Sequence, residues 1–140
     1  MDYETIRSNL ATLLGTITSL AYVYTSREPN VEGYPSAILD LTDLKNEPLT
    51  NIENLHQGVF KIFLIQELVV EGGAVNSNQI LDGVTQDVVA KLEDRANIGL
   101  SGSVDWIEPV VGKREEIQTP QGIAFSQEIT VTFYKSVSTL

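Results

Sequence analysis

The chain has 140 residues, with 19 Asp and Glu against nine Lys and Arg, a formal net charge of −10 and no cysteine. Disulfide bonds and thiolate metal sites are therefore excluded, and so few cations cannot provide a broad phosphate-binding face for nucleic acid. With a hydrophobic fraction of 42%, no apolar run long enough for a membrane span and no signal-peptide core at its acidic start, residues 1–140 are expected to form a single domain that is made in the cytoplasm.

The chain begins with a pattern typical of an amphipathic helix. Its apolar residues recur at spacings of three and four, namely Ile6, Leu10, Leu13, Leu14 and Ile17. Asp2 and Glu4 lie where negative charge favours the helix dipole, and we expect the helix to end near Ser19 or Leu20. A short strand over residues 21–24 and a polar loop with two prolines follow.

Two strands are predicted next, over residues 36–41 and 57–70. The segment between them, residues 42–54, is expected to be a polar loop or an irregular edge, because Pro48 excludes a central strand. The second strand is apolar on both faces, with Phe60, Ile62, Leu64 and Leu68 on one and Val59, Phe63, Ile65 and Val69 on the other. Either another subunit or the loop around Pro48 can cover the second of these faces, and the pattern leaves both alternatives open.

A second helix is predicted after residue 75, with Asn76 or Ser77 as its cap. Its apolar stripe consists of Ile80, Leu81, Val84, Val88 and Leu92. A strand in "GSVDWIEPVVG" should bend or stop near Pro109, and "KREEIQTPQG" reads as a charged loop between hairpin arms. The last strand alternates: Ile123, Phe125, Ile129, Val131, Phe133 and Val137 share an apolar face, opposite Ser126, Glu128, Thr130, Thr132, Tyr134 and Ser136.

Two of these strands are long for a domain of this size. Fourteen residues, 57–70, would span about 46 Å at about 3.3 Å per residue, whereas a compact domain of this length is about 37 Å across. The strands must therefore bend at bulges or project beyond the body. The sequence predicts an α+β fold, a single layered domain whose largely antiparallel sheet carries two helices on one face and has a long projecting hairpin.

The sequence offers no catalytic constellation, so we expect no enzyme and no catalytic, cofactor-binding or metal-binding residues. His56 is the only histidine, and neither a nucleophile elbow nor a phosphate loop is present. Glu115 and Glu116 are adjacent, so on a strand they would lie on opposite faces. The aromatic side chains of Trp106, Phe125 and Phe133 are expected in the core, and Tyr22, Tyr24 and Tyr34 either pack around the first loop or form an interface.

The order of elements carries a family resemblance. An amphipathic helix is followed by "GYPSAILDL", a polar excursion, "ENLHQGVFKIFLIQE", a helix in "NSNQILDGVTQDVVAKLED" and the closing strand "SQEITVTFYKSV". This arrangement resembles the tail-terminator, or tail-completion, proteins of long-tailed bacteriophages over nearly the whole chain. The Tyr-Pro before the short apolar strand is the closest local match.

The resemblance implies a structural protein of the virion, located at the head-proximal end of the tail after assembly in the host cytoplasm. It implies a hexameric ring that caps the tail tube, stops its elongation and joins a head-completion or neck protein, with DNA only passing through and with no cofactor or membrane contact. Two alternatives remain open: a head-completion or neck connector protein, and a small-ligand-binding α+β module.

Contacts between subunits or with partners are expected from two groups of residues. One lies on the two long strands: Lys61, Glu67, Glu128, Thr130, Thr132 and Tyr134. The other lies in the charged segment and would face the next ring: Arg114, Glu115 and Glu116. A solvated sheet face is the competing interpretation of these positions.

Overall fold

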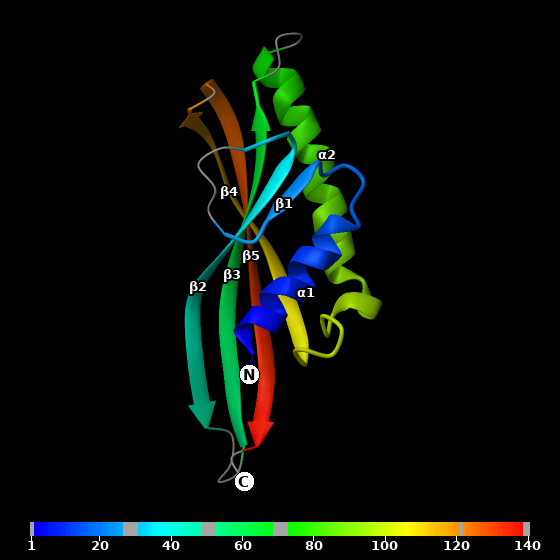
Figure 1. Ribbon diagram of the computed structural model, residues 1–140, viewed down its shortest axis with the longest axis vertical. Coiled ribbons are helices and arrows are strands. Elements are labelled where there is room, and N and C mark those ends of the chain that lie inside the picture. Colours follow the sequence, from blue (N-terminus) through cyan, green and yellow to red (C-terminus); the bar gives the residue numbers. More distant parts are fainter. Residues whose placement is uncertain (1, 27–30, 49–52, 69–72, 121, 139–140) are drawn as a thin grey trace.

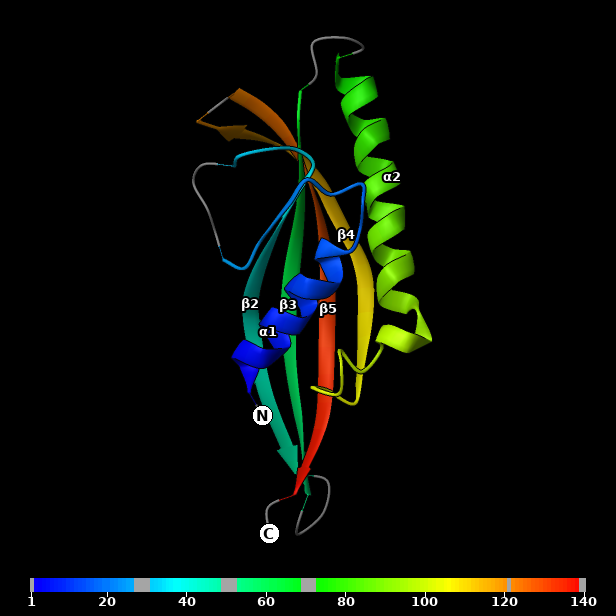
Figure 2. The same ribbon diagram turned by 45° about the vertical axis from the view of Figure 1, so that its right-hand side comes forward.

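The computed structural model describes residues 2–26, 31–48, 53–68, 73–120 and 122–138. Its elements are α1 (Tyr3–Gly15), β1 (Tyr22–Tyr24), β2 (Ser36–Pro48), β3 (Glu53–Glu67), α2 (Gly73–Glu93), a 3₁₀ turn η1 (Arg95–Asn97), β4 (Trp106–Thr119) and β5 (Gly122–Ser138). The sheet has the order β1-β2-β3-β5-β4, in which only β1 and β2 are parallel. Both helices pack against the same face of this sheet (Figures 1 and 2), so the predicted α+β class is confirmed.

Both helices form, but with different ends from those predicted. The carboxylate of Asp2 caps α1 by accepting the backbone N–H groups of Glu4 and Thr5. The helix ends at Gly15, before the predicted Ser19 or Leu20, because backbone hydrogen bonds turn the chain at Thr16 and Ile17. α2 starts at Gly73 rather than at a cap on Asn76 or Ser77.

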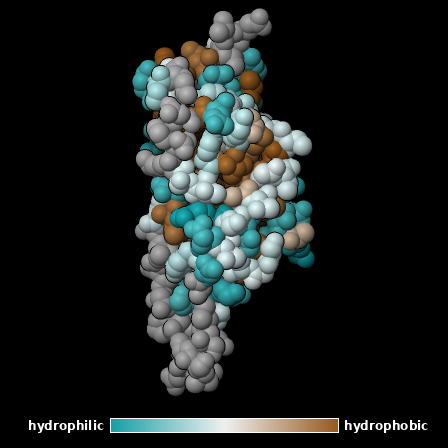
Figure 3. Space-filling view, viewed as in Figure 1, coloured by the Kyte–Doolittle hydropathy of each residue, from teal (hydrophilic) through white to brown (hydrophobic). Residues whose placement is uncertain are grey.

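The main core lies between the helices and the sheet. Ile6, Leu10 and Leu14 of α1 and Leu81, Val84, Val88 and Leu92 of α2 pack on Phe60, Ile62 and Leu64 of β3 and Ile129, Val131 and Phe133 of β5. The predicted apolar faces of both helices and of the middle of both long strands are therefore buried, whereas Leu68 and Ile123, predicted on the same faces, are exposed at 41% and 40%. Seen from the helix side, the remaining surface is mostly hydrophilic or neutral, with a compact hydrophobic area beside the middle of α2 (Figure 3).

The second face of β3 is covered by this chain itself, but only in part. Val31 and the partly buried Tyr24 and Tyr34 pack on Ile65 and Phe63, in a smaller cluster that also contains Ile38, Ala124 and Ile117. The cover is thus the segment after β1, not the loop around Pro48. Val69, also predicted on this face, lies outside the described residues.

Several segments predicted as loops or breaks are strands. β2 continues through Pro48, and β4 continues through Pro109 and residues 113–119. Proline is tolerated at an edge, where the missing N–H breaks no ladder bond. β4 is the last strand of the sheet, and no described strand pairs with the outer side of β2 beyond Ile38.

The two strands that are long for a domain of this size are accommodated because their ends project beyond the helices, and only the flanking strands contain bulges. β3 and β5 pair without a register shift from Glu53 opposite Ser138 to Glu67 opposite Ala124. The shifts occur in β2 between Leu41 and Asp43 and in β4 between Val111 and Arg114. The ends of β2, β3 and β5 extend past α1 and past the start of β4 (Figure 1), so the projection is three-stranded rather than a hairpin.

Candidate functional site

The sheet face opposite the helices is covered only in part, by the cluster around Val31 and Tyr34. We call the part of this face beyond that cluster the open face. In register order across the strands it contains Asp40, Lys61, Glu128, Thr130, Thr132, Tyr134, Trp106, Glu108 and Val110. Five of the residues that the sequence singled out as contact candidates therefore lie together here: Lys61, Glu128, Thr130, Thr132 and Tyr134.

An aromatic pair marks one end of the open face. Trp106 lies opposite Tyr134, and the two rings stack with centroids 4.6 Å apart. Trp106 is 37% exposed, so its predicted place in the core is wrong; the neighbouring Ile107 fills the core, since successive strand residues alternate between faces. The Tyr134 hydroxyl donates a hydrogen bond to Glu108, and burial together with this carboxylate raises the pKa of Tyr134 above its ordinary value.

An ion pair lies at the centre of the open face. Lys61 Nζ is 2.9 Å from Glu128 Oε1, with the lysine side chain 39% and the glutamate side chain 13% exposed. The Glu128 carboxylate lies over Gly112, where an added Cβ would be 2.8 Å from Oε2. A glycine at this bulge therefore provides the space for the carboxylate.

The other predicted contact residues are distributed over both faces. Glu67 is exposed on the side of β3 that Tyr34 covers, and Glu115 lies opposite Ser126 on the same side of the sheet. Glu116 lies opposite Phe125, on the helix side. These two glutamates therefore lie on opposite faces, as expected for neighbours in a strand.

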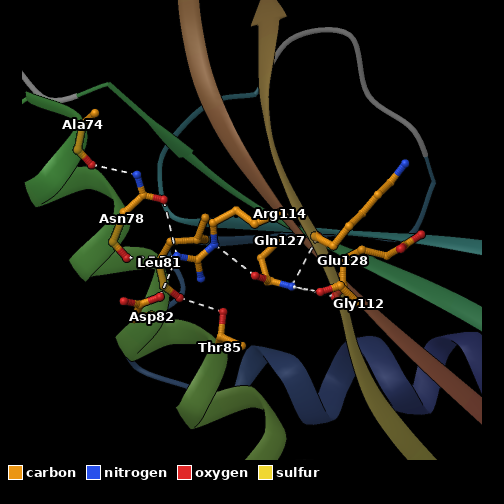
Figure 4. A network of polar contacts seen from close by, with 10 residues as sticks. Ala74, Asn78, Leu81, Asp82, Thr85, Gly112, Arg114, Gln127 and Glu128 are labelled. Atoms are coloured by element: carbon orange, nitrogen blue, oxygen red, sulfur yellow. Dashed lines mark hydrogen bonds and ion pairs between the residues drawn. The ribbon is translucent and has the colours of Figure 1, made fainter.

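Arg114 lies within the molecule rather than in a loop. Its guanidinium contacts Asp82 Oδ1 at 2.5 Å and donates to the Gln127 side-chain oxygen at 3.0 Å, with longer bonds to Asn78 (Figure 4). Gln127 is buried and donates in turn to the Gly112 carbonyl at 2.9 Å. This network ties α2 to the bulge of β4 through β5.

A cleft of about 510 Å³ lies beside this network, between α2 and β4. It is lined by Asp82, Thr85, Gln86, Val111, Arg114 and Gln127. Arg114 and Gln127 already have protein partners, so these two polar groups of the cleft serve the packing of α2 on β4. Sequence reasoning missed Gln127 and Asp82, because their partners are 13 and 32 residues away from them in sequence at Arg114.

Replacing Arg114 by alanine is expected to lower the free energy of unfolding by about 1–3 kcal/mol, because the buried Gln127 oxygen loses its donor. Replacing Asp82 by alanine should cost no more than about 1 kcal/mol, since this carboxylate is 60% exposed. Urea denaturation of both variants, followed by circular dichroism, measures the difference. Equal losses would show that the ion pair, and not the buried amide, is the stabilising part.

The sequence predicts neither a metal site nor a catalytic histidine, and in the described part of the chain the potential metal ligands and the histidine lie as follows. No group of three or more potential metal ligands occurs there, and His56 occupies a ladder position between Asn46 and Lys135. Of the two described helices, neither combines the length and apolarity needed to cross a membrane. No protein-family model matches the chain, and no curated protein matches it with significant similarity.

Proposed function

We propose that this protein is a structural ring component of a long-tailed bacteriophage tail, which caps the tail tube and stops its elongation. The observation that carries the proposal is the sheet itself. β2, β3 and β5 extend beyond the helix layer, part of the opposite sheet face remains open, and Trp106 and Val110 are exposed on it at 37% and 62%. Exposed apolar and aromatic residues within a polar surround are typical of protein interaction surfaces.

The order of elements supports the same proposal. The helix, the strand after Tyr34-Pro35, the long strand, the second helix and the long alternating strand match the elements α1, β2, β3, α2 and β5. On these elements the chain resembles tail-terminator proteins. A ring of six copies, each carrying −10, would hold −60 in formal charge. Such a ring would not retain DNA in passage, because DNA binding relies on Lys and Arg that neutralise phosphates.

The proposal is tested by adding the protein to polymerising tail-tube subunits. We expect a substoichiometric amount, one ring for each growing end, to shorten the tubes seen by electron microscopy, because a capped end adds no further subunits. An unrelated acidic protein at equal concentration is the control and should leave tube length unchanged. Tubes that lengthen at an unchanged rate in the presence of folded protein would contradict the capping function.

The α2–β4 cleft favours a second function, that of a small-ligand-binding module. Its volume falls in the range of about 300–1,000 Å³ that is usual for such sites. A ligand in this cleft would lie against Arg114, so Arg114→Ala should weaken its binding without affecting tube length. A neck connector, in contrast, would bind a head-completion protein while leaving tube elongation unchanged.

A further inference from the structure

A stacked aromatic pair and two carboxylates lie together at the start of β4. Trp106 stacks on Tyr134, and the Glu108 carboxylate accepts a hydrogen bond from the Tyr134 hydroxyl at 3.2 Å. Asp105, the residue before Trp106, accepts one from the backbone N–H of Ser136 at 2.7 Å. We call Asp105, Trp106, Glu108 and Tyr134 the acidic platform. It lies at the end of the open face that adjoins the projecting strands.

The indole of Trp106 has one face free for a further contact. Tyr134 stacks on the other face, and Trp106 is still 37% exposed because β4 is the edge of the sheet. Among the described residues the cation that lies over an aromatic ring is Arg7, above Phe60 and not at this site. Tryptophan offers cations the most favourable face of the aromatic side chains. The acidic platform can therefore receive a cationic group from another molecule.

The two carboxylates of the acidic platform accept hydrogen bonds from neutral groups, and no described cation is paired with either of them. Lys61, on the same face, is paired with Glu128 at 2.9 Å. Lys135 is close in sequence to Tyr134 but lies on the helix side of the sheet. Burial and the charge of Glu108 raise the pKa of Tyr134, as expected beside a negative charge that no cation offsets.

We propose that the acidic platform docks a basic segment of a partner protein, with one arginine stacked on Trp106 and a second cationic side chain paired with Glu108 or Asp105. Arginine stacks on aromatic faces and forms charge-assisted hydrogen bonds to carboxylates. Complementary charge of this kind accelerates association and suppresses wrong partners. The inference rests on the proposed function in one respect, since it takes the open face as the contact surface of a tail component.

The net charge of the chain favours this occupant over two others. A second copy carries the same −10 and would be repelled. Nucleic acid is excluded at this site for the same reason, because its phosphates need Lys and Arg beside them. A basic protein segment supplies the cations that the acidic platform lacks.

Trp106 is the only tryptophan of the chain, so its fluorescence reports directly on the acidic platform. The probe is an arginine–glycine repeat peptide, and a citrulline–glycine peptide of equal length has nearly the same shape without the charge. The intact protein is titrated with each peptide at low ionic strength, because salt screens exposed charges. We expect the arginine peptide to change the Trp106 fluorescence until the site is saturated, and the citrulline peptide to leave it unchanged.

Three variants locate the binding, with Kd measured by titration calorimetry and folding checked by circular dichroism. Glu108→Gln removes the charge and keeps the size of the side chain, and Trp106→Leu removes the aromatic face. Each should raise the Kd of the arginine peptide at least about threefold. Glu93→Gln is the matched control, since this exposed carboxylate lies in the last turn of α2, in the helix layer. It should change the Kd less than about twofold.

Equal weakening by Glu108→Gln and Glu93→Gln would overturn the inference, because binding would then follow net charge and not this site. Binding that leaves Trp106 fluorescence unchanged, or equal binding of the citrulline peptide, would do the same. Self-association of the protein that Trp106→Leu abolishes, seen by light scattering without peptide binding, would make a second copy the occupant and overturn the basic partner.

The tube-length assay separates this result from the proposed function. Folded protein that shortens tail tubes but does not bind the arginine peptide would overturn the docking surface and leave the ring standing. Protein that binds the peptide as described but leaves tube length unchanged would support the docking surface and contradict the capping function.

Discussion

Replacing Phe133 by alanine is expected to lower the free energy of unfolding by about 3–5 kcal/mol. The side chain is fully buried, and its ring centroid lies 5.3 Å from that of Phe60 and 6.3 Å from that of Tyr3. It joins β5, β3 and α1, so its removal leaves a cavity that no single element can fill. Because domains of this kind are stable by about 5–15 kcal/mol, the loss is a large part of the total. Urea denaturation followed by circular dichroism measures it.

Val110→Ala is the matched control for this prediction. It removes apolar atoms from the same sheet, but from a side chain that is 62% exposed. Its effect on the free energy of unfolding should stay within about 0.5 kcal/mol. A loss below about 1 kcal/mol for Phe133→Ala would mean that the core around α1 collapses to fill the space, or that this end of the sheet does not pack as described.

Gly58→Ala is expected to be destabilising by about 1–3 kcal/mol through overpacking. Gly58 pairs with Phe133 across the β3–β5 ladder, and the aromatic ring lies over it. A Cβ at this position would be 2.1 Å from Cζ of Phe133, so the ring has to move. Since Phe60 and Tyr3 also contact that ring, the movement disturbs the core. Thermal unfolding monitored by circular dichroism would detect the loss.

A second background separates overpacking from a general effect of the added methyl group. In a Phe133→Leu variant the methyl group has more room, and the cost of Gly58→Ala should fall, giving a favourable coupling in the double-mutant cycle. Gly83→Ala is the control with the opposite sign. Nothing lies within 4 Å of a Cβ at Gly83, and alanine in the helix should stabilise by up to about 1 kcal/mol. Additive effects of Gly58 and Phe133 would contradict the close approach.

The alternation of apolar residues predicted the sheet faces well, because a strand repeats every two residues and a buried face tolerates few exceptions. Phe60, Ile62 and Leu64 are fully buried together, as are Ile129, Val131 and Phe133. The same period placed Lys61, Glu128 and Thr130 on one face. The part of the candidate site that lies on the central strands was thus predictable from the sequence alone.

The polar segments were not predictable in the same way. Residues 113–119 show no apolar face, since this end of β4 is largely exposed, and their strand conformation comes from the hairpin with β5. Pro48 and Pro109 indicate strand ends in the sequence, but they lie in β2 and β4, whose outer sides are edges of the sheet at these positions. Arg114 resembled a surface contact because its partner Asp82 lies on another element. In each of these cases the conformation depends on pairing with a segment that is distant in sequence, and a local sequence pattern contains no information about such pairing.

The position of β5 in the sheet has a consequence for biosynthesis. β5 lies between β3 and β4, yet the ribosome makes it after every other strand. When β3 leaves the ribosome, the backbone groups on its β5 side therefore have no pairing partner. They stay unpaired until α2, β4 and then β5 have been translated. The pairing of β3 with β5 joins residues as distant in sequence as Glu53 and Ser138, a topology that slows folding. Chaperone binding to the nascent chain should accordingly be greatest late in synthesis, when β3 has left the ribosome and β5 is still being translated.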